Sequence, residues 1–363
     1  MTDPQHYVAI VGCGIIGRTH AQTIAARPDA VVTALVDSDP AARAALKAEL
    51  AALGQEPNTY DNLTTALAEA DVSLVAICTP SGTHAALAEE ALEQKKHVII
   101  EKPLDVDLVR ARRLGAAVTR AANHGVLASV ISQHRFDAGS ATVKQAIDAG
   151  RFGQLTSAVA TVAWWRSDEY YASAGWRGTW AQDGGGALMN QGVHTVDLML
   201  WFMGRPVTIQ AQAIRAAHHA IEVEDTVVAT LTFENGAVGT LHATTAAFPG
   251  SRTRVSVHGT KGGAEVENDR LRRLHLDGVK QEAVIEPGEP GRHTAQYDDI
   301  LQAITNSTPP AITVHDAIDA LATVRAVYVA STLQRPVEFI DVLEGRYDDV
   351  DVSRGIRRQA PAS

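Results

Sequence analysis

The chain has 363 residues, a length that predicts two domains rather than one small core. Hydrophobic residues make up 45% and charged residues 20%, as in ordinary globular proteins, and the formal net charge of −10 disfavours nucleic acid or an anionic membrane as a main partner. The N-terminus shows no signal peptide, and no stretch of about 18 apolar residues predicts a membrane span. We therefore expect a cytoplasmic protein in which Cys13 and Cys78 are buried, reduced thiols.

Short apolar runs alternate with helix-like segments over residues 1–132. The runs cover residues 7–11, 30–36, 71–78, 97–101 and 126–131, and "NTYDN" at 58–62 is a candidate for one more strand. Their near-continuous hydrophobicity is typical of strands buried on both faces. The alternation predicts right-handed crossovers and an α/β fold, with a doubly wound parallel sheet of the Rossmann type in this part of the chain.

Three glycines follow the first run in "GCGIIG" and open the first predicted helix. A strand-to-helix turn without a ligand is the alternative reading of such a motif. However, Asp37 closes the second predicted strand, where a carboxylate can accept hydrogen bonds from ribose hydroxyls. We therefore predict a dinucleotide site in which Gly12 makes the turn, Gly14 leaves room for the pyrophosphate, and Gly17 lets the helix pack on the strand.

Asp37 also bears on the choice of cofactor. Its negative charge repels a 2′-phosphate, so we expect NAD rather than NADP. Ser38 and Arg43 lie close by in the sequence and are the residues that can weaken this preference.

Two further stretches follow predicted strand ends, where ligands collect in open parallel sheets: "CTPSGTHA" at 78–85 and "EKPLD" at 101–105. Together with "HRFD" at 134–137 and "WRGTW…GGGALMNQGVHTVDL" within 176–198, they make the sequence resemble the oxidoreductase family named after glucose–fructose oxidoreductase and myo-inositol dehydrogenase. The resemblance runs from about residue 7 to about residue 340. It implies NAD(P)-dependent oxidation or reduction at a CH–OH group, and cofactor contacts by Trp176 and Arg177.

The motif and the resemblance together give the expected cofactor-binding residues, which are Gly12, Gly14, Ile15, Ile16, Gly17, Asp37, Ser38, Thr79, Pro80, Ser81, His84, Glu101, Lys102, Trp176 and Arg177.

Lys102 stands at the end of a predicted buried strand, between Glu101 and Pro103. Lysines usually extend an apolar stem along the surface and keep the ammonium group in solvent, which is the alternative here. We predict instead a cation that faces the substrate oxygen gaining or losing a proton, with a pKa set by desolvation and neighbouring charges. The family resemblance implies the same role and a cis peptide bond before Pro103.

Residues 133–340 predict an α+β domain that binds substrate and carries a mostly antiparallel, open sheet. Asn235-Gly236 marks a hairpin, and His218–His219 with the acidic stretch 222–225 suggests a solvated turn. We expect strands at 153–165, 207–214, 225–248, 252–259 and 264–269, and helices at about 187–203, 294–306 and 315–333. The last helices can pack back on the first domain, and residues 341–363 form a peripheral tail.

His194 lies in an almost wholly apolar predicted helix, on which Asn190, His194 and Asp197 form one polar stripe. A buried structural histidine is the alternative, and metal binding with Asp197 lacks a further cluster of ligands, so we expect no metal. The family resemblance implies a catalytic role for His194. Many members carry Asp where Asn190 stands, so we predict a reduced catalytic pair of Lys102 and His194, with Asn190 orienting substrate or imidazole through neutral hydrogen bonds.

Four tryptophans cluster between residues 164 and 180. They predict either a platform for the apolar faces of a sugar ring or an aromatic cover over the domain junction. The expected substrate-binding residues are Lys102, Arg135, Trp165, Arg166, Asn190 and His194.

The sequence thus predicts an NAD-dependent dehydrogenase or reductase that transfers a hydride between the nicotinamide and a secondary alcohol of a sugar, cyclitol or sugar derivative. The alternatives are an NADPH-dependent keto-sugar reductase and a non-catalytic dinucleotide-sensing regulator. Because sheets of this family commonly pair between subunits, we expect a homodimer or homotetramer formed through the second domain. The sugar, the oxidised carbon and the direction of reaction are not specified by the sequence.

Overall fold

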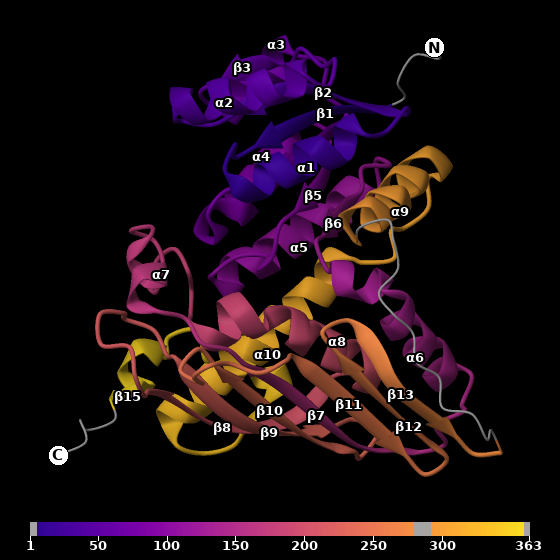
Figure 1. Ribbon diagram of the computed structural model, residues 1–363, viewed down its shortest axis with the longest axis vertical. Coiled ribbons are helices and arrows are strands. Elements are labelled where there is room, and N and C mark those ends of the chain that lie inside the picture. The colour runs from indigo at the N-terminus through magenta and orange to yellow at the C-terminus, as the bar shows by residue number, and fades with distance from the viewer. Residues whose placement is uncertain (1–5, 279–291, 359–363) are drawn as a thin grey trace. The chain divides into compact units, whose positions relative to one another are not determined.

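The computed structural model describes residues 6–278 and 292–358, and the chain forms two compact units (Figure 1). Among the described residues, unit 1 holds 6–105, 110–131 and 293–315. Unit 2 holds 106–109, 132–278, 292 and 316–358. The sequence suggested a boundary after residue 132, with last helices that can pack back on the first domain, and the structure assigns residues 293–315 to unit 1.

Unit 1 is built on a parallel six-stranded sheet with the order β3-β2-β1-β4-β5-β6. This is the dinucleotide-binding Rossmann order, and the six strands confirm every predicted run, including the short one at residues 58–60. The strands are β1 (His6–Val11), β2 (Ala30–Val36), β3 (Asn58–Tyr60), β4 (Leu74–Ile77), β5 (His97–Ile100) and β6 (Ala128–Val130).

Helices connect these strands and cover the sheet. They are α1 (Ile15–Ala25), α2 (Pro40–Ala51), α3 (Leu63–Glu69), α4 (His84–Glu93) and α5 (Leu108–Ala122), with α9 (Arg292–Asn306) added from the end of the chain. Asp39 and Asn62 cap α2 and α3 by accepting backbone N–H groups of the first turn. The core between sheet and helices is fully buried and includes Cys13 and Cys78, which are free thiols as expected.

Unit 2 carries a nine-stranded, mostly antiparallel sheet with the order β13-β12-β11-β7-β10-β9-β8-β14, and β15 pairs with β8. Only the β7–β10 and β8–β15 pairs are parallel. The strands are β7 (Leu155–Ala163), β8 (Pro206–Arg215), β9 (Thr226–Phe233), β10 (Val238–Thr244), β11 (Arg254–Gly259), β12 (Gly262–Glu267), β13 (Arg270–Leu276), β14 (Val337–Glu338) and β15 (Arg357–Arg358). Asn235-Gly236 forms the predicted β9–β10 hairpin, with Gly236 at a φ of 81°.

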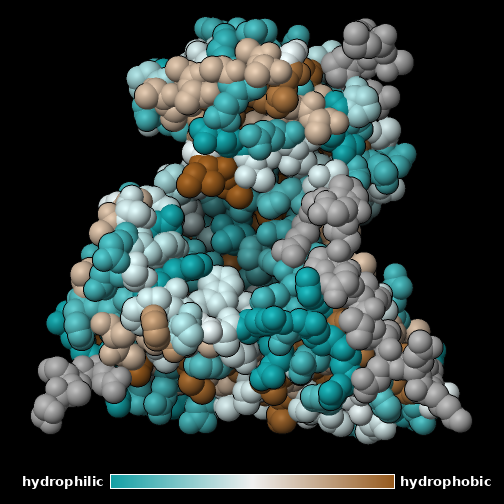
Figure 2. All heavy atoms as spheres, viewed as in Figure 1, coloured by the Kyte–Doolittle hydropathy of each residue, from teal (hydrophilic) through white to brown (hydrophobic). Residues whose placement is uncertain are grey.

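The helices of unit 2 lie on one face of this sheet (Figure 1). Its longer helices are α6 (Ala138–Asp148), α8 (Val193–Met203) and α10 (Val314–Leu333), and its short ones are α7 (Asp168–Ala172) and α11 (Phe339–Leu343). The opposite face of β7 to β10 exposes Val, Thr, Ser and Gln side chains, with Val228 52% and Val238 56% exposed. The surface over β11 is instead hydrophilic (Figure 2) and carries the exposed Arg254. None of the helices in the described ranges is long and apolar enough to cross a membrane.

The helix expected at about 187–203 is confirmed, although its first turns form a π-helix, η3 (Ala187–Gly192), that continues into α8. Two other expectations for unit 2 do not hold. The supposed solvated turn is only partly in solvent: His219 and Glu222 are exposed, but His218 is 2% and both Glu224 and Asp225 are 0% exposed. The chain after residue 341 is not a peripheral tail up to residue 358, because Val342, Val352 and Ile356 bury their side chains in unit 2. In each case the decisive contacts are with residues distant in the sequence.

Candidate active site

The glycine-rich turn follows β1 in unit 1 and has the shape that a dinucleotide requires. Gly12 has a φ of 95°, and a Cβ on Gly17 would lie 1.8 Å from the Gly12 carbonyl oxygen, so both positions exclude other residues. A Cβ on the exposed Gly14 would meet no atom within 4 Å. The turn is therefore tight against the protein but open at Gly14, where the N-terminus of α1 presents its N–H groups to a phosphate. Ile15, 84% exposed, and the half-buried Ile16 begin that helix.

Asp37 follows β2 and is fixed beside this turn. Its Oδ2 accepts the Cys13 N–H at 2.8 Å, and its Oδ1 accepts the Asp39 N–H at 2.9 Å. Each carboxylate oxygen keeps a second lone pair for a ribose hydroxyl. The Arg43 guanidinium donates to the Asp37 carbonyl, and Ser38 is exposed next to it. The turn and Asp37 thus fit a bound dinucleotide.

The segment after β4 holds Thr79, Pro80 and Ser81 at the start of a 3₁₀ turn (Ser81–Thr83), beside the glycine-rich turn in the sheet order. His84 is 1% exposed, and its Nδ1 and Nε2 lie 2.8 Å from the carbonyl oxygens of Pro103 and Thr79. Both ring nitrogens are therefore bonded within the protein. This corrects the expectation that His84 contacts the cofactor. The His84 ring instead joins the loop that contains Thr79 to the loop that contains Pro103, and these are the two loops that were predicted to contact the cofactor.

Glu101 is likewise an internal support rather than a cofactor ligand. It is 5% exposed, its Oε1 lies 2.9 Å from His20 Nε2, and its Oε2 accepts the Lys102 N–H at 3.0 Å. Burial acts to raise the pKa of Glu101, but the hydrogen bond from His20, the His293 imidazole 3.6 Å away and the charge of Lys102 hold it well below its usual range. Tyr297 lies 2.7 Å from His20 Nδ1 and completes a buried hydrogen-bonded chain. Lys102 itself is half-buried, and its bond to Pro103 is cis, as expected.

Nitrogen and oxygen atoms of His20, Glu101 and His293 gather within 4.8 Å, as do those of His134, Asp137 and Asp269 in unit 2. The sequence did not indicate either grouping. In the first, Tyr297 and Glu101 already occupy the two ring nitrogens of His20, so hydrogen bonding accounts for its arrangement.

In unit 2 the polar side chains around Asn190 form one network. Asn190 Nδ2 donates to Asp183 Oδ1, and Gln191 Nε2 donates to Asn190 Oδ1 at 3.2 Å. Arg166 Nη2 donates to Gln191 Oε1 at 3.0 Å, which connects the predicted substrate residues Asn190 and Arg166. Asp183 is 3% exposed and was missed from the sequence, although an acid directly before three glycines was its signal. A carboxylate therefore stands beside Asn190, in a region where the family resemblance implied an acid at position 190.

His194 is the second residue of α8 and is half-buried. Its ring meets that of His134 edge to face, with centroids 4.6 Å apart, and His134 Nδ1 lies 2.5 Å from Asp269 Oδ1. His134 is thus a neighbour of His194. It belongs to the "HRFD" motif, of which only Arg135 was predicted to bind substrate.

Arg135 and Asp197 do not take the places expected of them. Arg135 is 8% exposed, donates to Asp197 at 2.9 and 2.6 Å, and pairs with Asp316 at 3.2 Å. Burial acts to lower the pKa of Arg135, but the two carboxylates raise it. Arg135 is therefore a buried structural cation and not a substrate ligand. Asp197 faces Arg135, which directly follows the His134 whose ring packs on His194.

Two arginines are packed between aromatic rings in this region. The Arg166 guanidinium lies 4.9 Å from both the Trp164 and Tyr170 rings, and that of Arg177 lies 4.5 Å from both the Trp176 and Tyr170 rings. These contacts hold the planes of the guanidinium groups while leaving their edges for hydrogen bonds.

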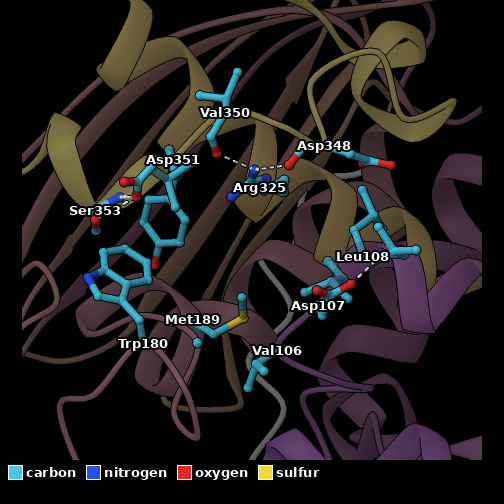
Figure 3. Close-up of a pocket in the computed structure, with 15 residues that line it drawn as sticks. Val106, Asp107, Leu108, Trp180, Met189, Arg325, Asp348, Val350, Asp351 and Ser353 are labelled. Atoms are coloured by element: carbon cyan, nitrogen blue, oxygen red, sulfur yellow. Dashed lines mark hydrogen bonds between the residues drawn. The ribbon is translucent and has the colours of Figure 1, made fainter.

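The remaining tryptophans lie elsewhere, so the four do not form a single platform. Trp165, 38% exposed, packs against Phe248 with ring centroids 5.6 Å apart. Trp180 packs on Tyr328 at 5.5 Å and lines a separate cavity of about 390 Å³ that also includes Met189 (Figure 3). The four tryptophans, although close together in the sequence, therefore lie in three different environments.

Comparison with known proteins agrees with this arrangement. Residues 7–131 match the oxidoreductase family with an NAD-binding Rossmann fold, and residues 140–265 match the C-terminal domain of the Gfo/Idh/MocA family. The chain is 30% identical to the oxidoreductase YrbE of Bacillus subtilis over 275 residues, covering 73% of this chain and 75% of that protein. It is 31% identical to the inositol 2-dehydrogenase of Rhizobium meliloti over 265 residues, covering 72% and 75% respectively.

A similar fold occurs in the WlbA dehydrogenase of Bordetella pertussis, crystallised with NADH and UDP-GlcNAcA. The two are 28% identical, with a TM-score of 0.82 over 93% of this chain and 99% of that one. The parallel sheet with its glycine-rich turn, the open antiparallel sheet and these matches lead to one conclusion: the chain belongs to the Gfo/Idh/MocA family of NAD(P)-dependent oxidoreductases, with an NAD-binding Rossmann domain at its N-terminus.

Proposed function

We propose that the protein is an NAD-dependent dehydrogenase or reductase acting on a secondary alcohol of a sugar, cyclitol or sugar derivative. The observation that carries this proposal is the hydrogen-bonded network that runs from Asp183 through Asn190 and Gln191 to Arg166. Asn190 and Gln191 shortly precede His194 in the same continuous helical segment. Carboxamides and a guanidinium group oriented by one another are suited to hydroxyl groups on a ring. An inositol dehydrogenase and a nucleotide-sugar-bound dehydrogenase among the similar proteins support a polyhydroxylated substrate.

The chemistry divides between cofactor and protein. Bound NAD supplies the hydride acceptor at its nicotinamide ring. His194 accepts the proton of the reacting hydroxyl, and its ring orientation is held by the packed ring of His134. Lys102 donates a hydrogen bond to the same oxygen and stabilises the negative charge that develops there. Asn190, held by Asp183, orients the substrate through uncharged hydrogen bonds.

The test is kinetic. A screen with NAD and a panel of sugars, cyclitols and nucleotide sugars identifies the substrate. Lys102→Ala and His194→Ala should then each lower kcat by about 10² or more with little change in NAD affinity, and the double variant should be scarcely worse, because the two groups act as a unit. His219→Ala removes an exposed histidine and is the matched control.

Other outcomes select the alternatives. Faster turnover with NADPH and a keto-sugar would favour the NADPH-dependent reductase. NAD binding without turnover of any alcohol in the panel would favour a dinucleotide-sensing regulator. Near-normal kcat in His194→Ala would make this histidine a structural residue.

We also propose that the protein assembles as a homodimer, or as a homotetramer made of two dimers, through the open face of its nine-stranded sheet. Strands β7 to β10 present mostly uncharged side chains there, including the exposed Val159, Val228 and Val238, beside the half-buried His242 of β10. Burial of such a face between two copies removes apolar surface from water without desolvating charged groups.

A further inference from the structure

Two adjacent acids, Glu224 and Asp225, precede β9 and are both fully buried. The backbone of Asp225 is already hydrogen-bonded as in a β-sheet, because its N–H donates to the Ile214 carbonyl and its own carbonyl accepts the Thr245 N–H. Consecutive side chains of an extended segment point to opposite sides. The two carboxylates accordingly engage different parts of unit 2, and burial of two carboxylates requires that each be fully hydrogen-bonded.

Glu224 binds the start of the π-helix η3. Its Oε2 accepts the Gly186 N–H at 2.8 Å, and its Oε1 accepts the Leu188 N–H at 2.9 Å and the Tyr328 hydroxyl at 3.0 Å. The Ala187 N–H between them donates to the Glu224 backbone carbonyl at 3.1 Å. One residue thus satisfies three consecutive N–H groups that a helix leaves without partners at its N-terminus. This helix carries Asn190 and continues directly into α8, which begins at Val193 and carries His194.

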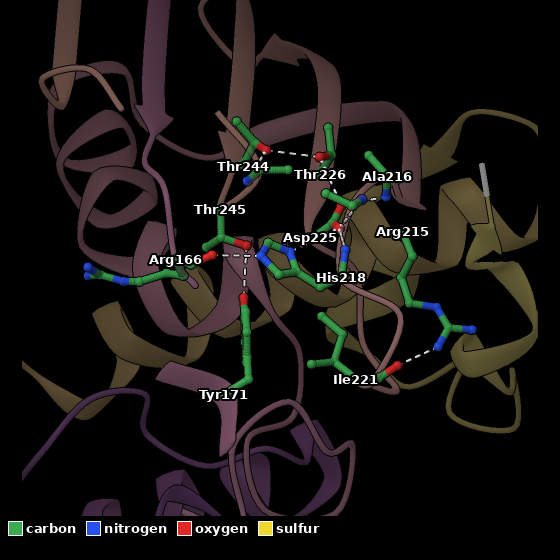
Figure 4. Close-up of polar contacts among 12 residues, drawn as sticks. Arg166, Tyr171, Arg215, Ala216, His218, Ile221, Asp225, Thr226, Thr244 and Thr245 are labelled. Carbon is green, nitrogen blue, oxygen red and sulfur yellow. Dashed lines mark hydrogen bonds and ion pairs between the residues drawn. The ribbon is translucent and has the colours of Figure 1, made fainter. Parts of the chain in front are cut away.

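Asp225 acts on the other side through His218 (Figure 4). Its carboxylate accepts the N–H groups of Ala216, Ala217 and His218 at 2.7 to 2.9 Å, and His218 Nδ1 lies 3.2 Å from it. His218 Nε2 then lies 2.7 Å from the Arg166 carbonyl oxygen. Burial acts to raise the pKa of Asp225, but these hydrogen bonds lower it to about 2. Asp225 is therefore a permanent anion that fixes the backbone of Arg166.

The Arg166–Gln191 hydrogen bond joins the two segments that these acids hold. We infer that Glu224 and Asp225 are positioning residues that set the register between the helix carrying Asn190 and His194 and the strand end carrying Arg166. The inference rests on the proposed function, because it assigns these two segments to the substrate. It predicts a division of labour: Glu224 supports the reacting geometry, and Asp225 supports substrate binding.

Glu224 adds a dependence on pH. Burial raises the pKa of Glu224 to about 7, although the hydrogen bonds from Leu188, Gly186 and Tyr328 act in the opposite direction. The groups that face this cluster are Tyr328 from α10, Tyr171 from α7, and the acids Asp183 and Asp225. Protonation converts one carboxylate oxygen into a donor, which the Tyr328 hydroxyl can accept by reversing its own hydrogen bond. Burial raises the pKa of Glu224 only while the segment is closed, so protonation favours the closed form, and the N-terminus of η3 should loosen as the pH rises through about 7.

The experiment compares Glu224→Gln and Asp225→Asn with Glu234→Gln, an exposed acid at the other end of β9. Glu224→Gln should lower kcat by about tenfold or more with KM for the alcohol little changed. Asp225→Asn should mainly raise that KM, by about tenfold. NAD affinity and the kinetics of the Glu234→Gln control should match the wild type.

Amide hydrogen exchange by mass spectrometry gives a readout that does not depend on activity. In the wild type, exchange over residues 184–192, corrected for its intrinsic pH dependence, should show a transition near pH 7 that Glu224→Gln abolishes. Asp225→Asn should increase exchange over residues 164–171 and 214–218.

Different results refute the proposed function and the positioning role. NAD binding without turnover of any alcohol in the panel would refute the proposed function, whatever the exchange shows. The positioning role is overturned if the wild type lacks the exchange transition, a measurement that needs no variant. The positioning role is also overturned if Glu224→Gln and Asp225→Asn show the same fall in kcat and the same rise in KM, because that pattern indicates a general loss of structure.

Discussion

At the scale of single residues, position 190 shows how a charge can be relocated. An amide stands at position 190, where the family resemblance led us to expect a carboxylate, and the buried carboxylate of Asp183 is its hydrogen-bond acceptor. Asp183 is itself held by the Gly178 N–H at 2.8 Å. The carboxylate is thus kept in this region, on Asp183 instead of on residue 190, while the Asn190 amide donates to Asp183 and accepts from Gln191.

Asn190→Asp tests this arrangement. It would place two carboxylates in contact, so that one takes up a proton more readily, and a second negative charge would make His194 more basic. We expect a loss of kcat milder than that of His194→Ala and an upward shift of the pH profile. The exchanged pair Asp183→Asn with Asn190→Asp restores one carboxylate and one amide, and should recover the wild-type profile and stability. A double variant that is worse than both single ones would contradict the exchange.

Asp37 governs the cofactor at the same scale. Its carboxylate is held within the glycine-rich turn by two N–H groups, so it cannot turn away from a 2′-phosphate without losing both. NAD should therefore bind at least about tenfold more tightly than NADP, a difference of about 1.4 kcal/mol. Titration of the purified protein with both cofactors measures the ratio, and Arg43→Ala should increase it further. Equal affinities would mean that Arg43 outweighs the carboxylate.

At the scale of elements, the turn from β1 into α1 contains two glycines with different roles: Gly17 is required for packing, and Gly14 is expected to be required for binding. Gly17→Ala brings a Cβ within 1.8 Å of the Gly12 carbonyl oxygen, and relief of that overlap requires α1 to move away from the sheet. Such overpacking costs about 1–3 kcal/mol. Gly14→Ala meets no protein atom within 4 Å, and its φ of −73° suits alanine.

The two alanine variants should therefore separate stability from binding. Gly17→Ala should lower the free energy of unfolding in urea. Gly14→Ala should leave it unchanged but weaken NAD binding by about tenfold or more in calorimetry, because its Cβ occupies the approach of the pyrophosphate. Tight NAD binding by Gly14→Ala would show that the pyrophosphate does not approach there.

At the scale of the whole molecule, assembly depends on the uncharged face of β7 to β10. Light scattering at micromolar concentration should report at least twice the 38.6 kDa of one chain. Val228→Glu places a charge at the centre of this face and should give monomers. Leu53→Glu, a charge on an equally exposed apolar residue of unit 1, is the control that should not. A wild-type protein found only as a monomer would remove the proposed interface.

Much of unit 1 could be read from the sequence because its signals are local. Each strand is a short, continuous apolar run, and a run buried on both faces needs no particular partner to be recognised. The glycines act through their own backbone geometry, and Asp37 is defined by its distance from them along the chain. The same holds for the Asn235-Gly236 hairpin in unit 2.

The sequence by itself therefore determined the two-part architecture, the dinucleotide turn, and the identity of Lys102, Asn190 and His194 as candidates. Only the tertiary structure decided how the polar residues are used: Arg135 pairs with Asp197, 62 residues away, and Glu224 meets Tyr328, 104 residues away. Along the chain such residues form hydrophilic stretches that indicate a surface. Burial of a charge is costly unless partners satisfy it, and partners so distant in sequence come together only when the chain has folded.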